Sequence, residues 1–69
     1  MSDTRVAIDI QELGNQAILD ALLNEKGEVF KTARGRRAIL IGTAALSRLS
    51  RSMHLRLEED PDGNQILKA

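Results

Sequence analysis

The sequence predicts a mainly α-helical fold in which two amphipathic helices form a hairpin and a second copy of the chain completes the core. Apolar residues recur at helical spacing over about residues 10–26 and again over about 34–59. The chain has only 69 residues and no cysteine. A chain of this size buries only about 60% of the surface that its unfolded form exposes, and this one lacks a disulfide or zinc-thiolate staple. We therefore expect one domain over residues 1–69, stabilised by homodimerisation, with residues 1–4 and 60–69 frayed.

A short strand, or an extended lead-in to the first helix, is expected at residues 5–10. Val6, Ile8 and Ile10 alternate with charged or small residues. This alternation places the three side chains on the same side of an extended segment. Both interpretations predict an extended backbone here.

The first helix is predicted at about residues 10–26. Asp9 and Glu12 have the spacing of a capping box, in which the first side chain accepts a hydrogen bond from a free amide and the second reaches back. Gly27 suits the position that follows the last turn. The apolar stripe of this helix contains Leu13, Ala17, Ile18, Ala21 and Leu22.

Leu19 and Leu23 lie on nearly the opposite side of this helix. A chain of this length cannot cover two faces of one helix by itself, and an uncovered apolar face marks an interface. We therefore expect both residues to contact a second subunit. The expected dimer interface consists of Leu19, Leu23, Leu46, Leu49 and Met53.

The second helix is predicted at about residues 34–59. It should end before Pro61, because proline disfavours a helical conformation in the residue that precedes it. Gly35 and Gly42 oppose this prediction, since a glycine inside a helix costs roughly 1 kcal/mol relative to alanine. The predicted apolar stripe contains Ala38, Ile41, Gly42, Ala45, Leu46, Leu49, Met53 and Leu57.

Two alternative interpretations of this segment contain strands. Residues 38–41 form a continuous apolar run, which as a buried strand would give an α+β fold of αββα order with a hairpin turn at residues 34–36. A later strand could turn at residues 62–64 and return at 65–67. The alternating residues that favour this second hairpin are Met53, Leu55 and Leu57.

Residues 28–33 connect the two predicted helices and contain Phe30, the only aromatic residue of the chain. A large apolar side chain at such a junction is usually buried between the helices. The other interpretation is that Phe30 anchors a partner, since isolated aromatic residues are favoured binding hot spots.

Catalytic and cofactor-binding patterns are missing from the sequence. The chain has one histidine, His54, and no cysteine, tyrosine or tryptophan, so it cannot supply the usual ligand set of a zinc site. Its five glycines match neither a dinucleotide-binding fingerprint nor a phosphate-binding loop. We expect a protein that is not an enzyme and that uses no cofactor or metal.

The net charge of zero hides an uneven distribution along the chain. Residues 1–25 sum to −4, residues 26–56 to +7 and residues 57–69 to −3. Arginine supplies seven of the ten basic residues, and its planar guanidinium group forms bidentate contacts with carboxylates and phosphates. The expected partner-binding residues are Arg34, Arg36, Arg37, Arg48, Arg51 and Phe30.

These features favour a small cytoplasmic regulator, of the adaptor or inhibitor type, that docks an acidic patch of a partner protein. Its arginines would pair with the acidic residues, and exposed apolar side chains would act as anchors. The alternative is a dimeric DNA-binding transcriptional regulator that contacts phosphates with the same basic segment. No membrane association is expected, because the longest apolar run, residues 38–41, is far too short to span a bilayer.

Overall fold

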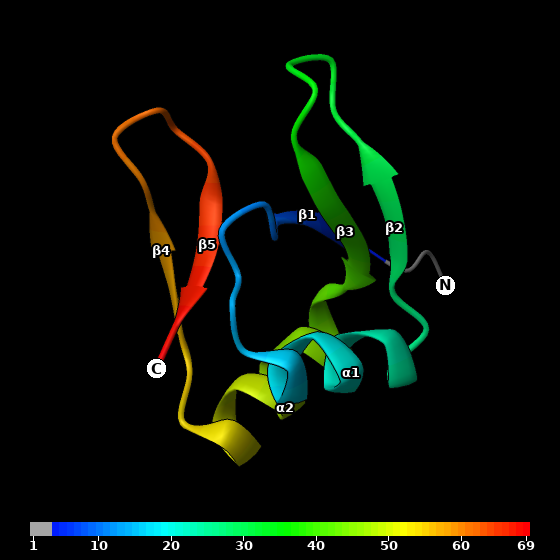
Figure 1. The fold of residues 1–69 in the computed structure, drawn as a ribbon. Helices are drawn as coiled ribbons and strands as arrows, with labels where there is room; N and C mark the ends of the chain where they lie inside the picture. The colour runs from blue at the N-terminus through cyan, green and yellow to red at the C-terminus, as the bar shows by residue number, and fades with distance from the viewer. Residues whose placement is uncertain (1–3) are drawn as a thin grey trace.

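The computed structural model describes residues 4–69 and shows an α+β fold with two antiparallel sheets and two helices (Figure 1). The described residues are 30% helix and 35% strand, so the prediction of a mainly α-helical hairpin is wrong. The elements in chain order are β1 (Arg5–Asp9), α1 (Gln16–Asn24), β2 (Glu28–Lys31), β3 (Arg37–Gly42), α2 (Thr43–Met53), β4 (Arg56–Glu59) and β5 (Gln65–Lys68).

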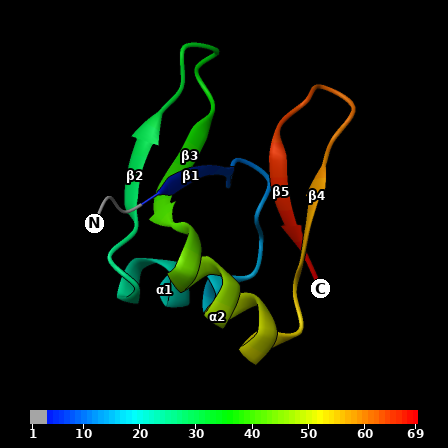
Figure 2. The same ribbon diagram turned by 180° about the vertical axis from the view of Figure 1, so that it is seen from behind.

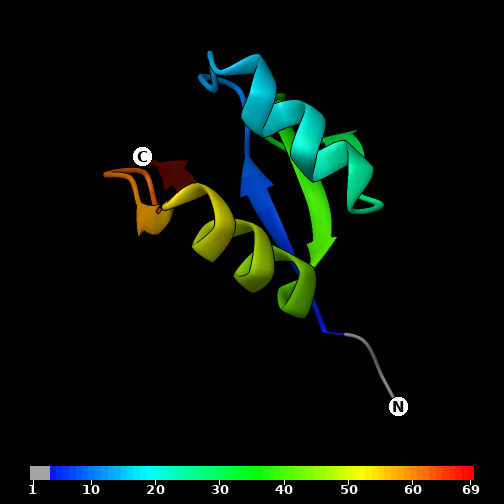
Figure 3. The same ribbon diagram turned by 90° about the horizontal axis from the view of Figure 1, so that it is seen from below.

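The larger sheet has the strand order β1-β3-β2, and both pairs of neighbouring strands are antiparallel. Ile39 of the central strand lies opposite Ile8 on one side and Val29 on the other, and residues that face each other across strands share a face of the sheet. Ile8, Ile39 and Ile41 are almost fully buried. Figure 3 shows α1 and α2 lying across the same side of β1 and β3. Both helices therefore pack on the sheet, and the predicted helix-on-helix hairpin is replaced by a sheet covered on one face.

The smaller sheet is the hairpin of β4 and β5, which forms a separate arm beside β1 (Figures 1 and 2). Leu67 lies opposite Leu57 in this hairpin, and Leu67 is buried in the common core. Residues 60–69, which we expected to fray, thus include a strand with a buried leucine. In the other segment expected to fray, residues 1–3 lie outside the described residues.

One apolar core draws side chains from β1, α1, β3, α2 and β5. It joins the helices, the larger sheet and the hairpin arm, so the described residues form a single packed unit. Its buried members are Ile8, Ile10, Ile18, Leu22, Ile39, Ile41, Leu46, Leu55 and Leu67.

The extended segment predicted at residues 5–10 is confirmed as β1, but the first helix starts later than predicted. The side chain of Asn15 caps α1, because its Oδ1 accepts hydrogen bonds from the backbone N–H groups of Ala17 at 3.0 Å and Ile18 at 3.4 Å. The capping box predicted at Asp9 is wrong. Asp9 Oδ1 instead accepts from the N–H of Gln11 at 2.9 Å, within the turn that precedes the helix.

The long helix predicted at residues 34–59 is also wrong. Its first part is the central strand β3, as in the alternative that placed a buried strand at residues 38–41. Only α2 is helical, and it ends at His54, whose left-handed backbone (φ 56°) closes the last turn. The chain then enters β4 and returns through β5, as the second alternative indicated.

Candidate functional site

The five arginines predicted to bind a partner do not form one surface. Arg34 and Arg36 belong to the hairpin loop between β2 and β3, and Arg37 begins β3. Arg48 and Arg51 lie on α2, at the opposite end of the molecule from that loop (Figure 1). A single helix would have brought these residues together, so the surface expected from the sequence is divided into two groups.

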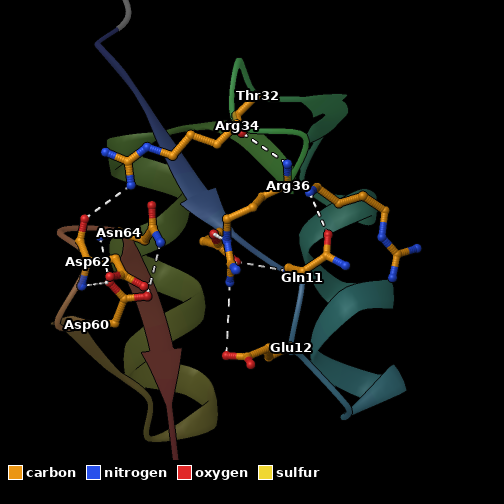
Figure 4. A network of polar contacts seen from close by, with 10 residues as sticks. Gln11, Glu12, Thr32, Arg34, Arg36, Asp60, Asp62 and Asn64 are labelled. Atoms are coloured by element: carbon orange, nitrogen blue, oxygen red, sulfur yellow. Dashed lines mark hydrogen bonds and ion pairs between the residues drawn. The ribbon is translucent and has the colours of Figure 1, made fainter.

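The guanidinium group of Arg36 binds acidic side chains within the chain itself. Its Nε atom contacts Asp9 Oδ2 at 2.5 Å and its Nη2 atom lies 3.2 Å from Asp9 Oδ1, which makes the contact bidentate. Nη2 also lies 4.0 Å from the carboxylate of Glu12 (Figure 4). The Asp9 side chain is only 7% exposed. The guanidinium group therefore neutralises a carboxylate that the fold has largely removed from water.

This contact changes the proton affinity of both partners. The hydrogen bond from Arg36 holds the pKa of Asp9 below its usual range, with further lowering by the N–H of Gln11, although burial opposes the change. The same bond raises the pKa of Arg36. Both groups are therefore charged at neutral pH, and Arg36 has little capacity left for an outside ligand.

Arg34 links the two hairpin loops. Its Nη1 atom donates to the backbone carbonyl of Asp62 at 3.3 Å, in the turn between β4 and β5 (Figure 4). Asp60 shapes that turn, since its carboxylate accepts from the N–H of Asn64 at 2.7 Å, the N–H of Asp62 at 3.0 Å and the Asn64 amide at 3.1 Å. The hydrogen bond from the Asn64 backbone is the main reason why the pKa of Asp60 is lowered. Arg34 therefore contacts the turn of the second hairpin through one exposed hydrogen bond.

The two arginines of α2, unlike Arg36, make few contacts among the described residues. The helix contains Arg48 and Arg51 and no acidic residue. Arg48 Nη2 lies 3.7 Å from the carboxylate of Glu25, next to the end of α1, in a surface pair of small energetic value. Among residues 4–69, no ion pair involves Arg51.

A shallow groove of about 570 Å³ runs between α2 and β4. Its apolar side chains are Leu46 and Leu57, and Leu57 is 46% exposed. The complete lining is Leu46, Ser47, Ser50, Arg51 and Leu57. This groove thus combines an apolar floor, two hydroxyl groups and an arginine without an acidic partner among the described residues. We call it the α2–β4 groove.

Leu57, Ser47 and Ser50 are not among the binding residues predicted from the sequence. Leu57 faces the same side of its hairpin as Leu67, but β4 is the strand farther from the core, so only Leu67 is buried. The alternation of Met53, Leu55 and Leu57 was the available signal for this strand.

The residues predicted at a dimer interface lie at different depths. Leu46 is buried in the core, and Leu19, Leu49 and Met53 are partly buried against it. Leu23 is 43% exposed. Phe30 is 40% exposed and lies opposite Ala38, on the face of the sheet away from Ile39 and the helices, so it does not fill a junction between helices.

A second hollow, of about 360 Å³, lies between the β1–α1 loop and β5. Its most buried polar group is the carboxylate of Asp9, which is already bound by Arg36, and the rest of its wall is largely apolar. Among residues 4–69, no cluster of three histidine, cysteine, aspartate or glutamate side chains could hold a metal ion. In the same part of the chain, neither helix has the length and hydrophobicity needed to cross a bilayer.

Comparisons with protein-family models, curated proteins and solved structures found no match to this chain.

Proposed function

We propose that this chain is a non-enzymatic, cytoplasmic regulatory protein of the adaptor or inhibitor type, which docks an acidic, partly apolar segment of a partner protein in the α2–β4 groove. The observation that carries the proposal is that Arg51 and Leu57 line one groove. An arginine beside an exposed leucine can bind a carboxylate and an apolar side chain of the same partner segment.

The charge distribution supports this choice of partner. The α2 helix carries two arginines and no acidic residue, so an acidic segment meets no like charge along the helix. The hydroxyl groups of Ser47 and Ser50, which also line the groove, add hydrogen-bonding capacity at its border. Arg34 and Arg36 do not line this groove; Arg34 donates to the Asp62 carbonyl and Arg36 pairs with Asp9.

The test uses a short fluorescent peptide of alternating glutamate and leucine, with binding followed by anisotropy. We expect Arg51→Glu and Leu57→Glu each to weaken binding by about tenfold or more, the equivalent of about 1.4 kcal/mol. The double variant Arg48→Glu/Arg51→Glu should abolish binding. Each variant should keep the circular dichroism spectrum of the wild type, because these side chains are exposed.

Arg37→Glu is the matched control, since Arg37 is an exposed arginine on β3 that does not line the groove. It should change the affinity by less than about twofold, because screening weakens charge effects beyond about 10 Å. If Arg37→Glu weakened binding as much as Arg51→Glu, the attraction would be unspecific and the groove would not be the site.

A second titration with random-sequence duplex DNA separates the two partner classes predicted from the sequence. Phosphate binding always includes an electrostatic component that falls steeply with salt. Binding of the peptide without affinity for DNA at low salt supports the protein partner. Salt-dependent DNA binding that is lost in Arg48→Glu/Arg51→Glu would instead support the DNA-binding alternative.

A further inference from the structure

Among residues 4–69, no strand pairs with the outer edge of strand β2. This strand is the outer strand of the order β1-β3-β2, and Figures 1 and 2 both show it at one side of the sheet, with no other strand of residues 4–69 beyond it. All four of its residues are exposed, including Val29 at 49% and Phe30 at 40%. An open edge with apolar side chains is a template for pairing with another strand.

The hydrogen-bond pattern shows which backbone groups face that edge. The N–H of Thr32 donates to the carbonyl of Arg36 at 2.8 Å, so Thr32 is turned inward, towards the strand that follows it. Inward and outward residues alternate in an antiparallel ladder. Phe30 is therefore bonded to β3, whereas Val29 and Lys31 direct their N–H and C=O groups away from the sheet.

The outward-facing backbone groups of β2 can pair with the same groups of a second β2. When a second β2 runs antiparallel to the first and the two Phe30 residues face each other, Val29 of each copy lies opposite Lys31 of the other. Both are outward-facing, so the N–H and C=O of each residue find partners across the junction. The two Phe30 side chains then meet at a position without hydrogen bonds, where cross-strand side chains approach most closely.

Charge disfavours one of the two neighbouring registers, and the length of β2 disfavours the other. With Phe30 opposite Phe30, Glu28 faces Thr32 of the other copy and Lys31 faces Val29, so no like charges are opposed. A shift of two residues in one direction places Lys31 opposite Lys31, which is unfavourable. A shift in the other direction places Lys31 opposite Gly27, outside the strand.

We propose that β2 pairs with β2 of a second copy about Phe30, which joins the two larger sheets into one antiparallel sheet of order β1-β3-β2-β2-β3-β1. This interface differs from the predicted one at Leu19, Leu23, Leu46, Leu49 and Met53. It also lies apart from the α2–β4 groove, so the two proposals can fail separately.

Sedimentation equilibrium tests the pairing, over total concentrations from about 1 μM to about 1 mM. The mass of the wild type should rise from one chain to two. Val29→Pro should remain a single chain throughout, because proline removes an outward N–H and leaves the bonds to β3 intact. Val29→Ala, which keeps that N–H, should still dimerise. A wild type that stays monomeric, or a Val29→Pro variant that dimerises normally, would overturn the proposal.

Phe30→Glu provides a second test that does not alter the backbone. It opposes two carboxylates at the centre of the junction, so the dimer should be lost, whereas Phe30→Leu should retain it. In hydrogen-exchange measurements on the wild type, the amides of Val29 and Lys31 should gain protection as the concentration rises, while the amides of α1 keep their rates. A dimer in which these two amides exchange as fast as in the monomer would place the interface elsewhere.

Discussion

Asp9 and Arg36 lie 27 positions apart in the sequence and form the most buried ion pair among the described residues. The pair joins the end of β1 to the loop that leads into β3, next to the point where Ile10 donates its N–H to the carbonyl of Arg37 at 3.0 Å. Removing one partner would leave the other charge without compensation. The ion pair therefore stabilises the pairing of the first strand with the central strand of the larger sheet.

Asp9→Asn should lower the free energy of unfolding at pH 7 by about 1–2 kcal/mol, since the amide loses charge-assisted hydrogen bonds from Arg36. Urea denaturation measures this change. Asp62→Asn is the matched control, because the backbone of Asp62, and not its side chain, makes the hydrogen bonds in which this residue takes part. Equal stability of Asp9→Asn and wild type would show that the pair contributes nothing net.

The stability of the wild type should fall on acidification in a defined window. The pKa of Asp9 is lowered in the folded state, chiefly by the hydrogen bond from Arg36, so its contribution is complete above the unfolded-state pKa of about 3.9. That contribution is lost as the pH falls below this value through the folded-state pKa. Urea midpoints measured from pH 7 to pH 2.5 should therefore converge for wild type and Asp9→Asn in acid. A constant difference between the two curves would contradict the assignment to Asp9.

Two glycine substitutions should have different effects. A Cβ atom on Gly27 would lie 2.5 Å from Ile39 Cδ1 and 2.8 Å from the carbonyl oxygen of Leu22, so Gly27→Ala should cost about 1–3 kcal/mol through overpacking. A Cβ on Gly14 meets nothing within 4 Å. Gly14→Ala should be neutral or should stabilise by up to about 1 kcal/mol, because it restricts the unfolded chain. Thermal melting of both variants checks the contrast, and equal melting temperatures would refute it.

Adjacent leucines of α1 should respond oppositely to aspartate. Leu22 has no exposed surface, whereas Leu23 is 43% exposed. Leu22→Asp should abolish cooperative melting, because it places an unpaired carboxylate in the core. Leu23→Asp should keep the helical signal. Its mass in sedimentation also separates the two dimer interfaces: dissociation would support the predicted helix face, and an unchanged dimer would support β2.

The elements that depend on local sequence patterns, β1 and α1, could be predicted from the sequence. The alternation of Val6, Ile8 and Ile10 predicted the extended segment that became β1. The stripe containing Ile18 and Leu22 predicted a helix, and both side chains are buried. The helix starts later than the capping-box spacing predicts, because the Asp9 carboxylate binds Arg36 and Asn15 caps the helix instead; sequence spacing does not reveal the contact with Arg36.

The failure at residues 34–59 has a tertiary cause. Ile39 and Ile41 of the central strand β3 are buried in the core with side chains of both helices, and continuous apolar runs are typical of such central strands as well as of buried helices. Gly35, with a positive φ of 78° in the hairpin turn, was the local sign of a chain reversal. The prediction of one basic surface failed for the same reason. One helix would align the five arginines, whereas the β2–β3 hairpin carries three of them and α2 carries the other two.

The position of β3 in the sheet has a consequence for how the chain acquires its structure. β3 is the last of the three strands along the chain, yet within residues 4–69 both β1 and β2 pair with it and with no other strand. While the polypeptide emerges from a ribosome, β1 has no strand to pair with, and α1 has no sheet to pack on, until residues 37–42 appear. The β2–β3 hairpin closes through a short turn, whereas pairing Arg5 with Gly42 closes a much longer loop, so the hairpin should form first and β1 should join it last.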